Sequence, residues 1–204
     1  MQISMIEQLL NNLSNAYSNQ NWEECSQLLE HLFLHLDRET CKKLSLKYVI
    51  NYFNDFGENH PNRIWIEDIL IEIERAISQQ LNLSDLLIDD VILKRFDSPG
   101  WPNFIVGLEA LWDTTNPELN IKEVAIGTSF SIANIIMAHM DKIWGERNLE
   151  VWIRVRYRDN EIYTEQDIVD SNSLLQDKAA LNFGVYLWEK LHKKLRKILI
   201  PPRA

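Results

Sequence analysis

Cysteine, glycine and proline are all scarce in this sequence of 204 residues. The two cysteines, Cys25 and Cys41, are too few for a disulfide framework, and both stand at apolar positions of helical patterns, so we expect reduced thiols in a core. Six glycines and six prolines leave long uninterrupted stretches for helices. These shortages exclude a disulfide scaffold and indicate a mainly α-helical protein.

The sequence also lacks the short motifs that mark common catalytic and cofactor sites. It contains no Walker A loop and no dinucleotide-binding glycine pattern, so we expect no cofactor. Gly127-Thr128-Ser129 matches half of a G-x-S-x-G nucleophile motif, but Ser131 stands where the second glycine belongs. We therefore predict no catalytic residue.

Histidines at helical spacing do not complete a metal site. His31 and His35 stand four residues apart, but no glutamate follows His31 as a zinc-protease helix requires. Glu189 and His192 have the spacing found in di-iron bundles, which use two such pairs where this chain has one. We therefore predict no bound metal.

Neither an export signal nor a membrane span is indicated. The first residues lack a basic segment ahead of an apolar one, which favours a cytoplasmic protein. The most apolar window, residues 124–140, contains Asn134 and His139 and is shorter than the roughly 20 apolar residues that a span needs. We predict a buried helix in which both side chains have internal hydrogen-bond partners.

What the sequence does contain is an ordinary share of apolar and charged residues, 46% and 25%, which suits a packed core. We predict a single domain over residues 1–204. Its charge is uneven, because residues 1–145 hold 10 basic and 21 acidic side chains while residues 146–204 hold 11 and 9. The acidic part disfavours general nucleic-acid binding and leaves the C-terminal part as the candidate for contacts with anions.

Apolar residues recur at helical spacing along most of the chain. We predict N-terminal helices within residues 1–97, a short helix after residue 102, a central buried helix over 121–144 and a C-terminal helix over 173–199. Asn21, Asp37 and Asn120 are the expected N-caps of three helices, and Ser171 or Ser173 that of the last. The order fits an orthogonal or up-and-down bundle, with HEAT-like pairs at the N-terminus as an alternative.

Residues 149–164 favour a small β-hairpin. Residues 149–158 alternate apolar and polar side chains and are rich in β-branched residues, and Asp159-Asn160 suits a hairpin turn. A helical count is also satisfied, so a helix remains the alternative; the residues that satisfy it are Leu149, Trp152, Ile153 and Tyr157.

Two groups of basic residues are the candidate binding sites. On a strand, alternate side chains share one face, which would collect Trp152, Arg154, Arg156 and Arg158. On the last helix, one stripe collects Lys190, Lys193, Lys194 and Lys197. Neutralisation by the acidic N-terminal helices is the alternative for the arginines, and a solvated helix face is the alternative for the lysines.

These observations favour a non-enzymatic protein–protein interaction module, such as an adaptor, a regulatory subunit or an inhibitor of the immunity-protein type. We expect the partner to be another protein, and self-association stays open. One alternative is a helical enzyme whose site assembles only in three dimensions, as a pocket would show if it held several of His31, His35, His139, Tyr186 and Glu189. The other is nucleic-acid binding through the basic C-terminal region.

Overall fold

The computed structural model describes residues 2–58, 60, 62–81, 83, 98–156 and 173–201. Within these ranges the chain forms eight α-helices and one short 3-10 helix, with no strand. The elements are α1 (Gln2–Ser18), α2 (Trp22–Phe33), α3 (Arg38–Phe56), α4 (Arg63–Gln79), α6 (Trp101–Asp113), α7 (Ile121–Arg147), α8 (Leu149–Arg156), η1 (Ser173–Gln176) and α10 (Lys178–Leu199). The mainly α-helical fold is confirmed, and residues 84–97, the last part of the predicted N-terminal helical region, lie outside the described residues.

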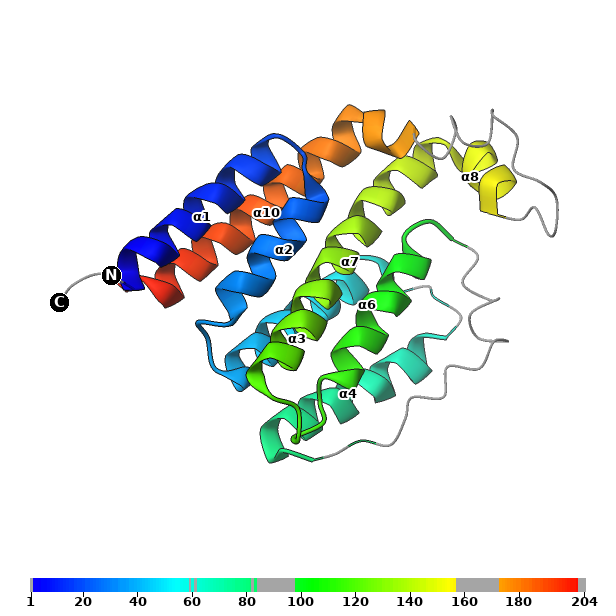
Figure 1. Cartoon of the computed structure of the whole chain (residues 1–204). Helices are drawn as coiled ribbons and strands as arrows, with labels where there is room; N and C mark the ends of the chain where they lie inside the picture. Colours follow the sequence, from blue (N-terminus) through cyan, green and yellow to red (C-terminus); the bar gives the residue numbers. More distant parts are fainter. Residues whose placement is uncertain are drawn as a thin grey trace.

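The longest helix, α7, runs through the middle of the molecule (Figure 1). It begins with a capping box, in which the Asn120 side chain accepts hydrogen bonds from the backbone N–H groups of Lys122 and Glu123 and the Glu123 carboxylate accepts one from the backbone of Asn120. Helices α2, α3, α6 and α10 all pack against α7. A helix therefore spans the predicted residues 121–144 and lies at the centre of the bundle, although Ile126 and Phe130 on one of its faces are exposed.

By length and hydropathy, α7 is also the one described helix that has the properties of a membrane span. Half of its most apolar stretch is buried inside the structure. The central helix of a soluble protein has the same composition, because it must be apolar nearly all round. The expected absence of a membrane span stays a prediction.

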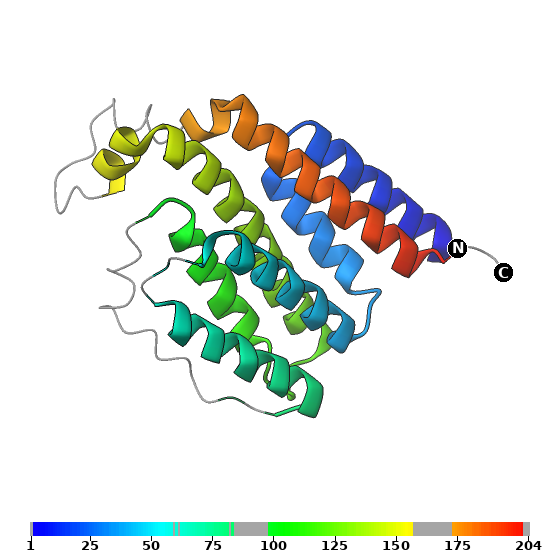
Figure 2. The same ribbon diagram turned by 180° about the vertical axis from the view of Figure 1, so that it is seen from behind.

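Two hydrophobic clusters lie against α7. The first cluster joins α1, α2, the start of α3, α8 and α10, and the second cluster joins the rest of α3 with α4 and α6. Helix α7 supplies Ile132 and Ile136 to the first cluster, and Ile135 and Ala138 to the second. Figures 1 and 2 show α1, α2 and α10 on one side of α7, and α4 and α6 on the other. The two clusters are therefore joined through α7 and α3, the two helices that contribute to both.

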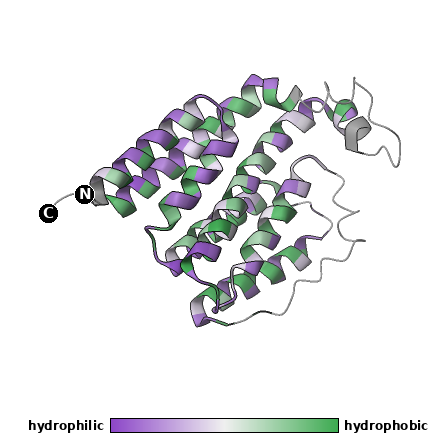
Figure 3. Cartoon of the chain, in the orientation of Figure 1, coloured by the Kyte–Doolittle hydropathy of each residue, from purple (hydrophilic) through white to green (hydrophobic). Residues whose placement is uncertain are grey.

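The helix contacts connect distant parts of the chain. Helix α1 packs along α10, and the two ends of the described chain come close together there (Figure 2). Solenoid repeats contact only their sequence neighbours, so the HEAT-like alternative does not describe this bundle. The helices also differ in hydropathy. Hydrophilic and hydrophobic residues alternate around α1, whereas α6 and α7 are mostly hydrophobic (Figure 3).

A chain of hydrogen bonds crosses the core between α3, α7 and α6. The Ser45 hydroxyl donates to the Ser131 oxygen at 2.7 Å, and the Ser131 hydroxyl donates to the backbone carbonyl of Gly107 at 2.6 Å. Both serines are buried. A Cβ atom at position 107 would lie 3.0 Å from the Ser131 carbonyl oxygen, so glycine allows α6 to approach α7 closely.

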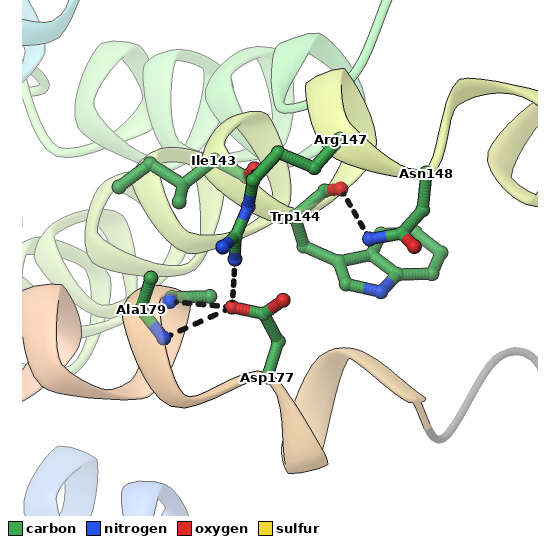
Figure 4. Close-up of polar contacts among 7 residues, drawn as sticks. Ile143, Trp144, Arg147, Asn148, Asp177 and Ala179 are labelled. Carbon is green, nitrogen blue, oxygen red and sulfur yellow. Dashed lines mark hydrogen bonds and ion pairs between the residues drawn. The ribbon is translucent and has the colours of Figure 1, made fainter.

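The end of α7 is joined to the start of α10 by an ion pair (Figure 4). Arg147 contacts the carboxylate of Asp177, which also accepts hydrogen bonds from the backbone N–H groups of Ala179 at 3.0 Å and Ala180 at 2.9 Å. Asp177 is thus the N-cap of α10. The expected cap at Ser171 or Ser173 is wrong. Asp177 has this position, because its carboxylate accepts hydrogen bonds from the first turn of α10 and pairs with Arg147 at the end of α7.

The predicted β-hairpin over 149–164 is not formed where the structure describes it. Residues 149–156 are the helix α8, and residues 157–164 lie outside the described ranges. The Trp152 N–H donates to the carbonyl of Asn148 at 2.9 Å, as an α-helix requires, and the Trp152 side chain is buried in the first cluster. Burial of this ring outweighs the β-propensity of its neighbours, since strand preference depends on packing context.

Candidate functional site

The four predicted lysines of α10 divide between two environments. Lys190 and Lys194 line a cleft between α10 and α3, here called the basic cleft. Lys193 instead forms an ion pair with Glu189 one turn earlier, at 2.6 Å, and Lys197 is exposed in the last turn. The stripe seen in the sequence therefore contributes two of its four cations to a concave surface.

The four predicted residues around 149–158 do not share a strand face. Trp152 is 4% exposed and belongs to the core, and it is followed on α8 by Arg154 and Arg156, because this segment is helical. Residues two apart on a helix point in different directions. The side chains of both arginines, and the whole of Arg158, lie outside the described residues, so binding by these arginines stays a prediction.

The polar residues named for the enzyme alternative are only partly brought together. His139 and Tyr186 line the basic cleft, whereas His31 lies on α2 and His35 lies in the turn that follows it. No group of three or more histidine, cysteine, aspartate or glutamate side chains in the described ranges is placed to hold a metal ion.

Asn134 and His139, the two side chains of the apolar window for which internal partners were predicted, differ in their hydrogen bonds. The Asn134 amide donates to the carbonyl of Phe130 at 2.9 Å, as expected. The Nδ1 atom of His139 is buried and has no hydrogen-bond partner among the described residues. The expectation of an internal partner is wrong for this atom, because aromatic rings surround it: Tyr52 and Phe56 from α3, and Phe183 from α10.

The basic cleft has a volume of about 780 Å³ and contains residues from three helices. Lys47 and Asn51 come from α3, and Lys190 and Lys194 come from α10. His139 lies between them on α7, against which both other helices pack. Figure 2 shows α3 and α10, the two helices that supply these lysines, in front of α7. Lys47 lies on α3, outside the predicted lysine stripe of α10, and was not among the binding residues predicted from the sequence.

The three lysines make the cleft strongly positive. None of Lys47, Lys190 and Lys194 is within ion-pair distance of a carboxylate in the part of the chain that the structure describes. Partial burial, and secondarily the charge of Lys47, lowers the pKa of Lys194. The Lys190 ammonium lies 4.5 Å from the centre of the Tyr186 ring, which stabilises it by a cation–π contact.

A second concave surface, between α6 and α7, is apolar. This apolar groove has a volume of about 430 Å³, and its walls include Val106 from α6 and Ile126 and Phe130 from α7. These three side chains are 39%, 44% and 49% exposed, respectively. Ala110, one turn after Val106 on α6, and Gly127, one turn before Phe130 on α7, also line the groove. Because residues three or four apart lie on one helix face, each helix presents a continuous apolar stripe to the groove.

Acidic side chains border the apolar groove on both helices. Glu109 lies between Val106 and Ala110 in the sequence of α6, and Glu123 lies one turn before Ile126 on α7. Both glutamates are exposed, and neither forms an ion pair with a described residue. The groove therefore combines an apolar floor with a negative border.

The apolar groove was not predicted from the sequence, because α7 was expected to lie wholly inside the core. The available signal was that α7 is apolar nearly all round, so any of its faces that lacks a covering helix becomes an exposed apolar surface. Which face lacks a cover depends on how the other helices pack, and the α7 sequence does not contain that information.

In comparisons with known proteins, no family model, no curated protein and no solved structure matches the chain. The function is therefore inferred from the chemistry of the two surfaces.

Proposed function

We propose that this chain is a protein–protein interaction module that binds a basic amphipathic helix of a partner protein in the apolar groove between α6 and α7. The observation that carries the proposal is the joint exposure of Val106, Ile126 and Phe130 along one groove. Single exposed apolar residues are ordinary on protein surfaces, whereas a contiguous apolar group with a polar border is typical of interaction sites.

The shape of the apolar groove suits a helix as its occupant. Apolar stripes on α6 and α7 form its walls, so an added helix can bury its own apolar residues between them, as amphipathic helices do in hydrophobic grooves. Phe130 is the largest exposed side chain there, and partly exposed aromatic residues often supply most of the binding energy of an interface.

Charge identifies the kind of helix. Glu109 and Glu123 border the groove, and residues 1–145 as a whole carry about twice as many acidic as basic side chains. A negative surface attracts a positive partner and repels nucleic acid. The partner segment is therefore expected to carry lysine or arginine on either side of its apolar stripe.

A photo-crosslinking experiment tests the proposal. A benzoylphenylalanine residue is placed at position 130, and the protein is irradiated in the lysate of the cells that produce it. We expect it to crosslink to a segment of another protein whose apolar residues recur at helical spacing and whose net charge is positive. Ile126→Ser should reduce the yield at least about tenfold, as loss of a central interface residue does.

Two controls distinguish binding in the apolar groove from non-specific hydrophobic binding and from a general effect of net charge. Ile71→Ser removes an apolar side chain that is 60% exposed on α4 and should leave the crosslink unchanged. Glu109→Lys should weaken it most at low salt, whereas Glu7→Lys, the same charge change on exposed α1, should have little effect. Crosslinks to an acidic segment or to a second copy of this chain would contradict the proposal, as would equal losses in Ile126→Ser and Ile71→Ser.

A further inference from the structure

We propose that the basic cleft between α3 and α10 is a binding site for a small organic phosphate that carries an aromatic ring. The cleft is lined by α3, α7 and α10, and the apolar groove is lined by α6 and α7. The two sites share only α7 and have opposite charge, so this proposal does not depend on the protein partner proposed above.

The charges of the cleft select the phosphate. Lys47, Lys190 and Lys194 bring three ammonium groups to one concavity, and Asp55 carries the only carboxylate among the described residues that line it. Like charges repel, so a cluster of lysines without carboxylate partners is stabilised by a bound anion, and more strongly by a dianion than by a monoanion. Lysine binds phosphate as a compact point charge and does not require the planar, two-pronged geometry of arginine.

The rings of the cleft select an aromatic group. Phe183 and Tyr186 lie one turn apart on α10, with their ring centres 5.7 Å apart, and Tyr186 is 44% exposed. Phe183 in turn lies 5.6 Å from the His139 ring. This row of rings offers a surface on which a planar ligand can stack. A volume of about 780 Å³ is also in the size range of small-molecule pockets.

His139 supplies a polar group at the floor of the cleft. The side chain is 3% exposed, and its Nδ1 has no hydrogen-bond partner among the described residues. Buried polar atoms in native proteins are almost always hydrogen-bonded, so an unpaired one on a residue that lines an open cleft is a candidate contact for a ligand. A neutral imidazole can donate a hydrogen bond from one nitrogen and accept one at the other.

Phenyl phosphate, the simplest molecule with both features, is the probe for the test. The full chain is titrated with phenyl phosphate, inorganic phosphate and phenol, and the ring signals of His139 and Tyr186 are followed by NMR. We expect saturable shifts of both rings with phenyl phosphate, at a dissociation constant at least about tenfold lower than for either half of the molecule. Equal affinity for inorganic phosphate would remove the aromatic part of the proposal.

Neighbouring lysines of α10 provide a matched pair of variants. Lys194→Gln and Lys47→Gln should each weaken phenyl phosphate binding about threefold to fivefold, whereas Lys193→Gln, next in the chain but paired with Glu189, should not. Thermal melting confirms that each variant is folded. Absence of saturable binding at millimolar concentrations, or equal weakening by all three variants, would overturn the proposal. A hexaglutamate peptide that displaces phenyl phosphate at lower concentration would instead assign the cleft to an acidic protein segment.

Discussion

His139 is a histidine whose environment opposes its charged form. Burial among aromatic rings lowers the pKa of His139 to about 4, from an ordinary value of 6.5. In the unfolded chain the same imidazole takes up a proton near pH 6.5. Between these two values the unfolded state binds more protons than the folded state, so the folded protein loses stability as the pH falls.

We expect the free energy of unfolding to fall as the pH drops from about 6.5 towards 4, with a contribution from His139 of at most about 3 kcal/mol. His139→Leu removes the titrating group while keeping an apolar side chain of similar size. Urea unfolding at pH 7.5 and pH 4 should show that this variant gains stability over the wild type at the lower pH. His31→Leu, on the exposed side of α2, should follow the wild type. Parallel curves for all three proteins would contradict the assignment.

At the scale of one element, two alanine substitutions test whether residues 149–156 form the helix α8. Trp152→Ala should lower the free energy of unfolding by about 3–5 kcal/mol, because the ring is 4% exposed and belongs to the first cluster. Leu149→Ala, on the same helix but 48% exposed, should change it by less than about 1 kcal/mol. Denaturant unfolding measures both values. A small loss for Trp152→Ala would mean that its indole lies on the surface, as the β-hairpin requires.

Helices with one apolar face and a side-chain cap could be predicted from the sequence. Asn21, Asp37 and Asn120 cap the helices for which they were expected, since a cap bonds to backbone within three residues and depends on local sequence alone. The burial of Cys25 and Cys41 was equally predictable from their place in apolar stripes. Helix α8 was not predictable, because its sequence fits both the helical and the strand period. Only the contact of Trp152 with the core decides between the two.

The candidate sites depend on contacts that the sequence does not express. Lys190 and Lys194 could be recognised as a basic stripe, but Lys47 joins them from α3 only through packing of both helices on α7. The apolar groove likewise arises where no helix of the described ranges covers Ile126 and Phe130. Long-range packing of this kind decides which residues become a surface and which become a core.

At the scale of the molecule, α7 determines how the two hydrophobic clusters behave. It supplies apolar residues to both, so neither cluster is complete without it. We therefore expect residues of the two clusters to unfold together, as a single domain does. With fluorine-labelled tryptophan, the folded signals of Trp188 in the first cluster and Trp101 in the second should disappear at the same urea concentration. Separate midpoints would show two independently folding units.

The pairing of α1 with α10 has a consequence for folding during synthesis. The second cluster is built from helices between residues 38 and 147, so its residues are all available once α7 has been made. The first cluster unites α1 and α2 with α10, the last described helix, so their apolar faces cannot be fully covered until the ribosome has made α10. The earliest helices of the nascent chain are thus among the last to be completed, and during this interval they are the segments most exposed to chaperones and to aggregation.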